Sequence, residues 1–209
     1  MSSNRKMAIK LAPAFVGLCV AGAIWVIGAR HWSKSSSVPA IETARHDLIQ
    51  KDGRWYRQGQ TSPFTGFMVD RYPNGALLSR CQVSNGLLNG VSECRYTNGQ
   101  MQAREYFKDG VSNGQREKWH ENGLLLSKAD IIDGKVNGTF RSWHDNGHLN
   151  EQIPMKLGKA DGLAWAYYPS GFLKAETTVR EGLVVSRKTW KDGEQTGSPP
   201  LAEAGTGRP

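Results

Sequence analysis

The sequence predicts an all-β protein, an elongated, solenoid-like meander of β-hairpin repeats with a 24-residue period, preceded by one N-terminal transmembrane α-helix. Three observations support this prediction. Glycines recur every 24 residues in three separate series, apolar and polar residues alternate between them, and an uncharged apolar run lies near the N-terminus.

Composition narrows the class of protein. The chain has 209 residues, 24 of them glycine and 7 tryptophan, and only 38% are hydrophobic. A large α/β enzyme needs a larger apolar share, and a disordered chain lacks aromatic residues. The chain therefore indicates a thin, glycine-punctuated fold. Its formal net charge of +8 comes from basic and acidic residues that are interleaved, which does not favour nucleic-acid binding.

The N-terminus predicts a membrane segment. Residues 1–10 are expected to be cytoplasmic, and residues 11–29 form an uncharged run that as a helix spans about 28 Å, close to the hydrocarbon core. Three basic side chains precede the run and two follow it, which favours a cytoplasmic N-terminus. The alternative is a signal peptide cleaved near Ala21-Gly22-Ala23. Both interpretations place the repeats outside the cytoplasm, either membrane-tethered or secreted.

Two segments are expected to be irregular. Residues 30–50 contain serines and a proline and are interpreted as a flexible linker, and residues 194–209 as a disordered tail. Between them, residues 51–193 carry five clear repeat units and one degenerate unit.

The repeat period is carried by glycine. The three series are Gly75, Gly99, Gly123, Gly147 and Gly171; Gly66, Gly90, Gly114, Gly138 and Gly162; and Gly86, Gly110, Gly134, Gly158 and Gly182. Many of these glycines follow Asn or Asp, and such pairs favour the positive φ angles of tight hairpin turns. Each unit is therefore predicted to contain two strands and two turns.

Residues between the turns alternate with a period of two, as in strands. Two apolar columns are Leu77, Met101, Leu125, Leu149 and Leu173, and Val83, Phe107, Ile131, Met155 and Val179. They are six positions apart, so both are expected on one face of the sheet. The other face is expected to carry the polar column Arg80, Arg104, Lys128, Gln152 and Glu176.

Aromatic residues occupy adjacent positions in the second strand of each unit. Short motifs recur there: Tyr-Thr-Asn-Gly at 96–99, Trp-His-Glu-Asn-Gly at 119–123 and Trp-His-Asp-Asn-Gly at 143–147. In these motifs the region 51–193 resembles the bacterial variant of the MORN-repeat family. The resemblance implies a β-hairpin solenoid used for scaffolding, membrane association or partner binding. Some bacterial relatives are labelled antitoxin-like.

Partner-binding residues are expected on the open sheet, because tryptophan, tyrosine and arginine dominate interface energetics. The aromatic candidates are Trp119, Trp143, Trp165, Tyr167 and Tyr168, and the basic candidates are Arg80, Arg104 and Lys128. The alternative roles are packing in aromatic ladders within the sheet and exposure on a solvated face.

Cys81 and Cys94 flank a predicted turn at 84–90. A turn centred between Leu87 and Leu88 would place the two cysteines directly opposite each other, at a separation that could adjust to a disulfide. The alternative is two thiols in adjacent strands.

Metal and cofactor sites are not expected. His120 and His144 occupy equivalent positions, but equivalent residues of successive units are about 9.5 Å apart, too far for one zinc ion. The sequence also lacks the phosphate-binding, zincin and nucleophile-elbow motifs of common enzymes.

The sequence therefore predicts a non-enzymatic, membrane-tethered repeat protein that presents its sheet to a protein or cell-envelope component. Two alternatives remain open: an antitoxin-like neutraliser of a toxin, and a surface that binds anionic lipid through the basic column.

Overall fold

The computed structural model describes residues 41–194, which form sixteen strands and one short 3₁₀ turn. The elements are β1 (Glu42–Ala44), η1 (Arg45–Asp47), β2 (Leu48–Lys51), β3 (Arg54–Arg57), β4 (Gly66–Arg71), β5 (Leu77–Ser84), β6 (Leu87–Arg95), β7 (Met101–Lys108), β8 (Val111–Trp119), β9 (Leu125–Ile132), β10 (Lys135–Val136), β11 (Gly138–Trp143), β12 (Leu149–Lys156), β13 (Lys159–Ala160), β14 (Gly162–Tyr167), β15 (Leu173–Arg180) and β16 (Leu183–Thr189).

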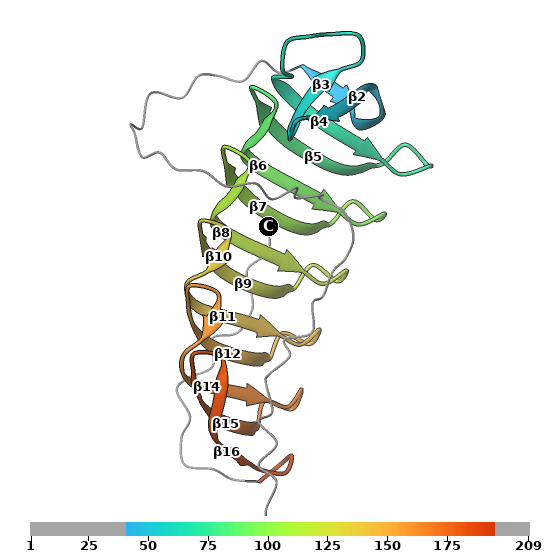
Figure 1. The fold of residues 1–209 in the computed structure, drawn as a ribbon. Coiled ribbons are helices and arrows are strands. Elements are labelled where there is room, and N and C mark those ends of the chain that lie inside the picture. The colour runs from blue at the N-terminus through green and yellow to red at the C-terminus, as the bar shows by residue number, and fades with distance from the viewer. Residues whose placement is uncertain (1–40, 195–209) are drawn as a thin grey trace, which may run out of the picture.

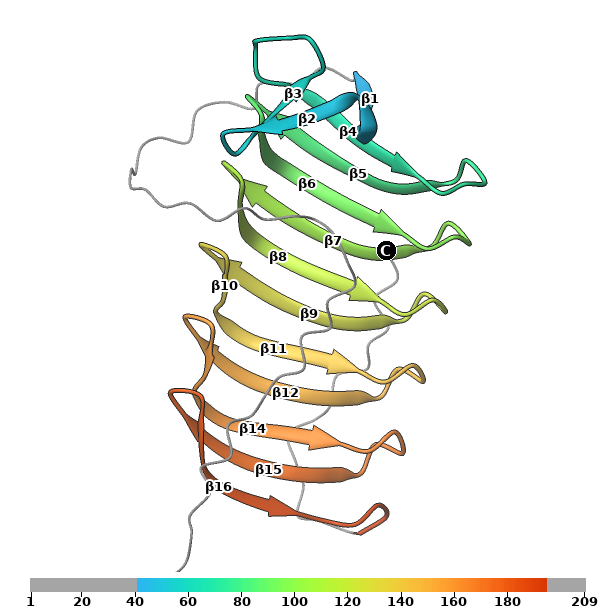
Figure 2. The ribbon, with the colours of Figure 1, turned by 45° about the vertical axis from the view of Figure 1, so that its right-hand side comes forward.

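Fourteen of these strands form one long sheet, and consecutive strands lie side by side from β4 to β16 (Figures 1 and 2). All pairings in this sheet are antiparallel except that of β1 with β4. β10 extends the pairing of β9, and β13 that of β12. The sheet is open and does not close on itself, so the predicted all-β meander is confirmed.

Tight turns of two kinds connect the strands along the two edges of the sheet. At one edge Asn85 and Gly86 both have positive φ, 49° and 77°, the backbone that a two-residue hairpin requires. At the other edge an asparagine closes four of the turns, at Asn74, Asn98, Asn122 and Asn146. The amide oxygen of Asn122 accepts the Leu124 N–H at 3.0 Å, and its amide nitrogen donates to Asp145 O of the next unit.

Successive hairpins also hold each other through backbone hydrogen bonds at the Asn85–Gly86 edge. Gly110 N donates to Leu88 O at 2.8 Å, and Gly134 N donates to Ser112 O at the same distance. The same contact recurs in the following units, so every unit is bonded to the one before it beyond the sheet ladder itself. This contact explains why the array repeats with so constant a geometry.

The two apolar columns form separate clusters. Met101, Leu125, Leu149 and Leu173 pack with aromatic residues near the asparagine turns, whereas Ile153, Met155 and Val179 belong to another cluster near the opposite edge. The expectation that both columns lie on one face of the sheet is wrong. The pairing of adjacent strands shifts register beside the columns, for example between Lys118 and Trp119 of β8. Such a bulge reverses the alternation of faces.

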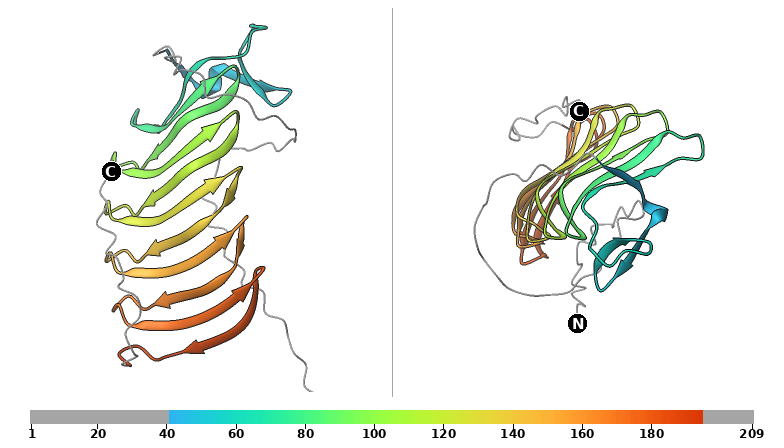
Figure 3. Two further views of the ribbon diagram at one scale, coloured as in Figure 1. Left: turned by 90° about the vertical axis from the view of Figure 1, so that its left-hand side faces the viewer. Right: turned by 90° about the horizontal axis from the view of Figure 1, so that it is seen from above.

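Residues 41–50 contain β1, η1 and most of β2, whereas the sequence predicts a flexible linker there. β1 adds to the edge strand β4, and β2 pairs with β3 in a separate hairpin beside the N-terminal end of the sheet (Figure 3). Leu48 of β2 packs with Met68 and Val83, so this hairpin covers the apolar end of the first strands. These residues therefore cover the first unit of the array, although they lie outside the 24-residue pattern.

The expected cytoplasmic segment 1–10, the transmembrane helix 11–29, residues 30–40 of the linker and nearly all of the tail 194–209 lie outside the described residues. Within residues 41–194, no helix has the length and apolarity needed to span a bilayer.

Candidate functional site

A row of mostly polar side chains crosses the middle of the sheet, one from each strand. Cross-strand register places its members directly opposite one another from strand to strand. We call it the central row, and the face that carries it the central-row face; its members are Arg80, Glu93, Arg104, Glu117, Lys128, Arg141, Gln152, Trp165, Glu176 and Lys188.

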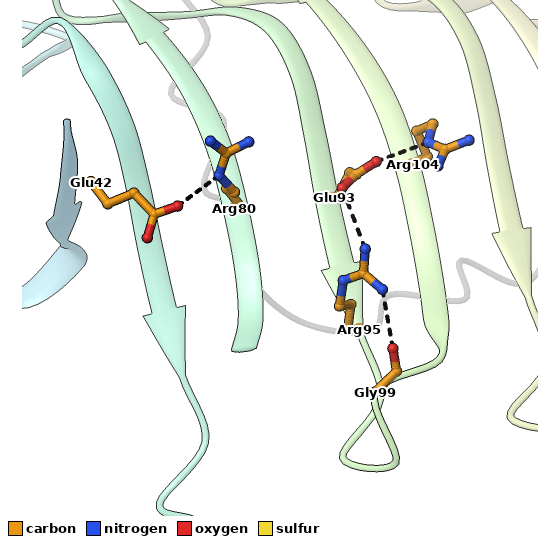
Figure 4. A network of polar contacts seen from close by, with 6 residues as sticks. All are labelled: Glu42, Arg80, Glu93, Arg95, Gly99 and Arg104. Carbon is orange, nitrogen blue, oxygen red and sulfur yellow. Dashed lines mark hydrogen bonds and ion pairs between the residues drawn. The ribbon is translucent and has the colours of Figure 1, made fainter. Parts of the chain in front are cut away.

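The bases in the first half of the central row form ion pairs, and Figure 4 shows those of Arg80 and Arg104. Arg80 Nε lies 2.9 Å from Glu42 Oε1, and Arg104 Nε lies 3.0 Å from Glu93 Oε1. The Lys128 ammonium continues the series 3.3 Å from a carboxylate oxygen of Glu117. Charges of opposite sign thus alternate from strand to strand, an arrangement that stabilises adjacent strands modestly.

The predicted basic residues Arg80, Arg104 and Lys128 do lie in one row, but they do not form a basic stripe. Each has a carboxylate partner, contributed by β1, β6 and β8 respectively. The single-sign stripe expected from the sequence is therefore wrong, because the acidic residues of the intervening strands fall in the same row. Partner binding by these three residues remains a prediction.

The aromatic candidates divide into buried and accessible residues. Trp119, Trp143 and Tyr167 are only 2%, 4% and 2% exposed and form the cluster near the asparagine turns. Their expected exposure on an open face is wrong, and ladder packing is the role that the structure gives them. Trp165 of the central row is half-buried and packs against the same cluster.

The aromatic cluster lies on the central-row face. The Arg104 guanidinium is 5.7 Å from the centroid of the Trp119 ring, and Trp119 follows Glu117 by two residues on the same strand. The central row therefore borders a buried aromatic cluster along the asparagine-turn edge.

A second column joins each unit to the next through side chains. Tyr96 Oη donates to Trp119 O at 2.8 Å, and the His120 ring Nε2 donates to Trp143 O at 2.9 Å. The same contact is made throughout the column by Tyr72, Tyr96, His120, His144 and Tyr168. His120 and His144 thus replace tyrosine in a structural role, and residues 41–194 contain no cluster of three or more potential metal ligands.

Cys81 and Cys94 are not directly opposite each other. Cys81 pairs with Ser92, whose hydroxyl oxygen is 3.0 Å from Cys81 Sγ, and Cys94 pairs with Ser79 and Ala103. The turn is centred at Asn85–Gly86 rather than at residues 87–88, and the strand pair shifts register near Gly90. The opposed geometry on which the expected disulfide depends is therefore absent.

Two tyrosines have perturbed ionisation. Burial raises the pKa of the Tyr167 phenol above its ordinary value. The pKa of Tyr96 is also raised, chiefly by burial and then by the negative charge of Glu121. Both shifts keep the phenols protonated, as a structural tyrosine requires, and neither prepares a group for acid–base catalysis.

A shallow depression of about 410 Å³ lies at the N-terminal end of the sheet, between β1 and the loop after β3. Arg57 lines it and donates to the Thr43 hydroxyl at 2.9 Å. Glu42 and Asp47 also line it, so its charge is mixed. Sequence reasoning missed this feature, since it is built by residues outside the repeat.

Sequence reasoning also missed a change in the central row. Arg141 occupies the position at which the two preceding units have Glu93 and Glu117. Gln152 occupies the position at which they have Arg104 and Lys128. The signal is present in the sequence, because residues 93, 117 and 141 are 24 apart. It becomes meaningful only when the register shows which columns face each other.

Comparison with known proteins identifies two of the units. Residues 88–109 and 136–157 match the family model of the MORN repeat variant. No curated protein matches the chain. The two matched segments each cover two strands and the asparagine turn between them, at Asn98 and Asn146, and the remaining units share their period and register.

Proposed function

We propose that this chain of MORN-variant repeats is a non-catalytic scaffold that binds another protein or a cell-envelope component through its central-row face. MORN repeats generally serve as non-catalytic binding modules. The function proposed here follows from that general role and from the shape of the sheet.

The observation that carries the proposal is the open, single sheet with one polar row running across ten consecutive strands. Such a surface offers charged and amide groups, with the half-buried Trp165, in a fixed order. It resembles the extended surfaces with which other repeat proteins bind their partners.

We further propose that residues 11–29 tether the scaffold to a membrane, with the repeats outside the cytoplasm. The uncharged length of this segment and the basic residues before it support this topology. A reporter active only outside the cytoplasm, fused to the C-terminus, should be active, and the chain should stay with membranes after alkaline extraction. An inactive reporter, or release by alkali, would contradict the tether.

A pull-down from detergent-solubilised membranes tests the binding surface. The full chain is compared with a variant that carries Arg80→Gln, Arg104→Gln and Lys128→Gln, and with a control of equal charge change that carries Lys108→Gln, Lys135→Gln and Lys159→Gln near the turns. We expect a protein retained by the wild type and the control but lost from the central-row variant. Equal retention by all three proteins would show that the central-row face is not the binding surface.

A further inference from the structure

The alternation of acidic and basic residues along the central row ends at β11. In the units before it, an acid on one strand faces a base on the next, as with Glu93 and Arg104. At β11 the acid is replaced by Arg141, and at β12 the base is replaced by the neutral Gln152. Arg141 consequently faces Lys128 on one side, a pair of like charges.

Arg141 has no carboxylate partner among residues 41–194. Its Nε donates to Gln152 Oε1 at 3.1 Å, a neutral acceptor. Glu117, which lies in the same row, is 3.3 Å from the Lys128 ammonium and so already has a basic partner. A guanidinium has five N–H donors in a planar fork, so its terminal nitrogens retain the capacity to bind a carboxylate.

Trp165 completes the patch. It lies opposite Gln152 on β14, so that Arg141, Gln152 and Trp165 stand side by side on three neighbouring strands. The indole is half-buried against the aromatic cluster, which fixes its position. Arginine and tryptophan are the residue types most enriched among energetically dominant interface positions.

We propose that Arg141, Gln152 and Trp165, here called the Arg141 patch, bind an extended acidic segment of a partner protein. The Arg141 guanidinium binds a carboxylate of that segment, the Gln152 amide bonds its backbone, and the Trp165 ring packs on its apolar part. This inference rests on the proposed scaffold function and names the chemistry of its partner.

Charge complementarity favours a peptide over a broad anionic surface. The basic stretch Lys128 and Arg141 lies in the central row between Glu117 of β8 and Glu176 of β15, which are five strand spacings or about 24 Å apart. A membrane surface or a nucleic-acid backbone presents continuous negative charge, which would extend past this basic stretch over both glutamates. A peptide with one or two carboxylates fits between them.

Fluorescence anisotropy tests the proposal with the purified full chain. The probe is a fluorescein-labelled decapeptide of serine that carries two glutamates and one leucine at its centre, and its control replaces both glutamates with glutamine. We expect the acidic probe to bind at least tenfold more tightly than the control peptide, and its affinity to fall as salt increases.

Three single variants locate the site. Arg141→Gln removes the guanidinium, and Gln152→Glu places a carboxylate beside it, so each should weaken the acidic probe at least fivefold. Lys159→Gln changes a base outside the central row that is already paired with Glu181, so its affinity should stay within twofold of the wild type. Circular dichroism confirms that each variant is folded.

Several results would overturn the proposal. These are no binding of the acidic probe, equal binding of both peptides, an unchanged affinity in Arg141→Gln, or an equal loss in Lys159→Gln. Binding to phosphatidylserine vesicles without binding to the peptide would also overturn it in favour of a membrane. Failure of this inference is distinguishable from failure of the scaffold function, because the pull-down with the Arg80, Arg104 and Lys128 variant does not depend on the Arg141 patch.

Discussion

Tyr96 and His120 show how one structural contact tolerates two kinds of side chain. Both occupy the same position in successive units, and each reaches a carbonyl oxygen 23 residues further along the chain. Because a carbonyl oxygen only accepts, the imidazole proton lies on Nε2 in this contact. The position therefore selects a ring with a donor at its far end rather than a titratable group.

Substitution of His144 tests this interpretation at the scale of one residue. His144→Tyr should keep the hydrogen bond to Tyr167 O and change the free energy of unfolding by less than about 0.5 kcal/mol. His144→Phe keeps a ring but removes the donor, so it should cost about 1 kcal/mol. Urea denaturation of the full chain measures both. Equal losses in the two variants would show that ring size, not the hydrogen bond, determines this position.

The raised pKa of Tyr167 predicts a dependence of stability on alkaline pH. Because the pKa of the Tyr167 phenol is higher in the folded chain than in the unfolded chain, the folded chain keeps this proton more fully above pH 10. Its contribution to stability is therefore complete below pH 10 and is lost as the pH rises through the folded pKa. The wild type should lose more unfolding free energy between pH 9 and pH 11 than Tyr167→Phe does. Identical losses would contradict the assignment.

At this scale the sequence predicts which residues repeat but not which way they point. Trp119 and Trp143 were expected to be exposed, yet each lies directly after a register shift that places it against an apolar cluster. Cys81 and Cys94 were expected to face each other, yet the bulge near Gly90 separates them. A bulge depends on local backbone geometry, which a count of alternate positions does not include.

At the scale of the element, the hairpin β2–β3 depends on one turn of the repeat. The Trp55 N–H donates to Gly86 O at 2.8 Å, and a Cβ on Gly86 would lie only 2.8 Å from Arg54 Cβ. Gly86 thus serves both its own turn and the contact with the N-terminal hairpin. The equivalent Gly182 has nearly the same φ, 82°, but open space around it.

Gly86→Ala and Gly182→Ala separate these two roles. Both variants place a side chain at positive φ, which costs about 1–2 kcal/mol. Gly86→Ala should cost more, because the hairpin must also move away from the turn. Thermal unfolding and hydrogen exchange of residues 48–57 measure the difference: exchange in this segment should rise in Gly86→Ala alone. Equal stability and equal exchange in both variants would show that the hairpin does not rest on this turn.

The strands themselves follow directly from the sequence. Asn-Gly and Asp-Gly pairs mark turns at the predicted positions, and their even spacing predicts the antiparallel order from β4 to β16. β1, β2 and β3 could not be predicted in this way, since they lie outside the period and are defined by what they cover. The Arg141 patch could be predicted only in part. Comparison of the units shows that its residues depart from the repeat, but only the strand register shows that they lie side by side.

At the scale of the whole molecule, each unit contacts mainly the units on either side of it. The ladder hydrogen bonds, the Tyr/His column and the turn contacts all join neighbours that are about one period apart. Stability should therefore be the sum of unit terms and interface terms rather than of one central core.

Removal of one period is the most direct test of this claim. Deletion of residues 135–158 joins Gly134 to Lys159 and so replaces the start of β10 with the equivalent start of β13. Spin labels on unnatural amino acids at positions 109 and 181, which are three units apart, report the length of the sheet by double electron–electron resonance. Six strand spacings correspond to about 29 Å, and the deletion should shorten the distance by about 10 Å.

We expect the shortened chain to keep its β-sheet circular dichroism with a narrow distance distribution near about 19 Å, four strand spacings. Deletion of only residues 135–146, half a period, should broaden the distribution and lower the stability sharply, because it joins a turn to a turn. A loss of folded structure on removal of the full period, or a distance that does not change, would contradict an open sheet built from interchangeable units.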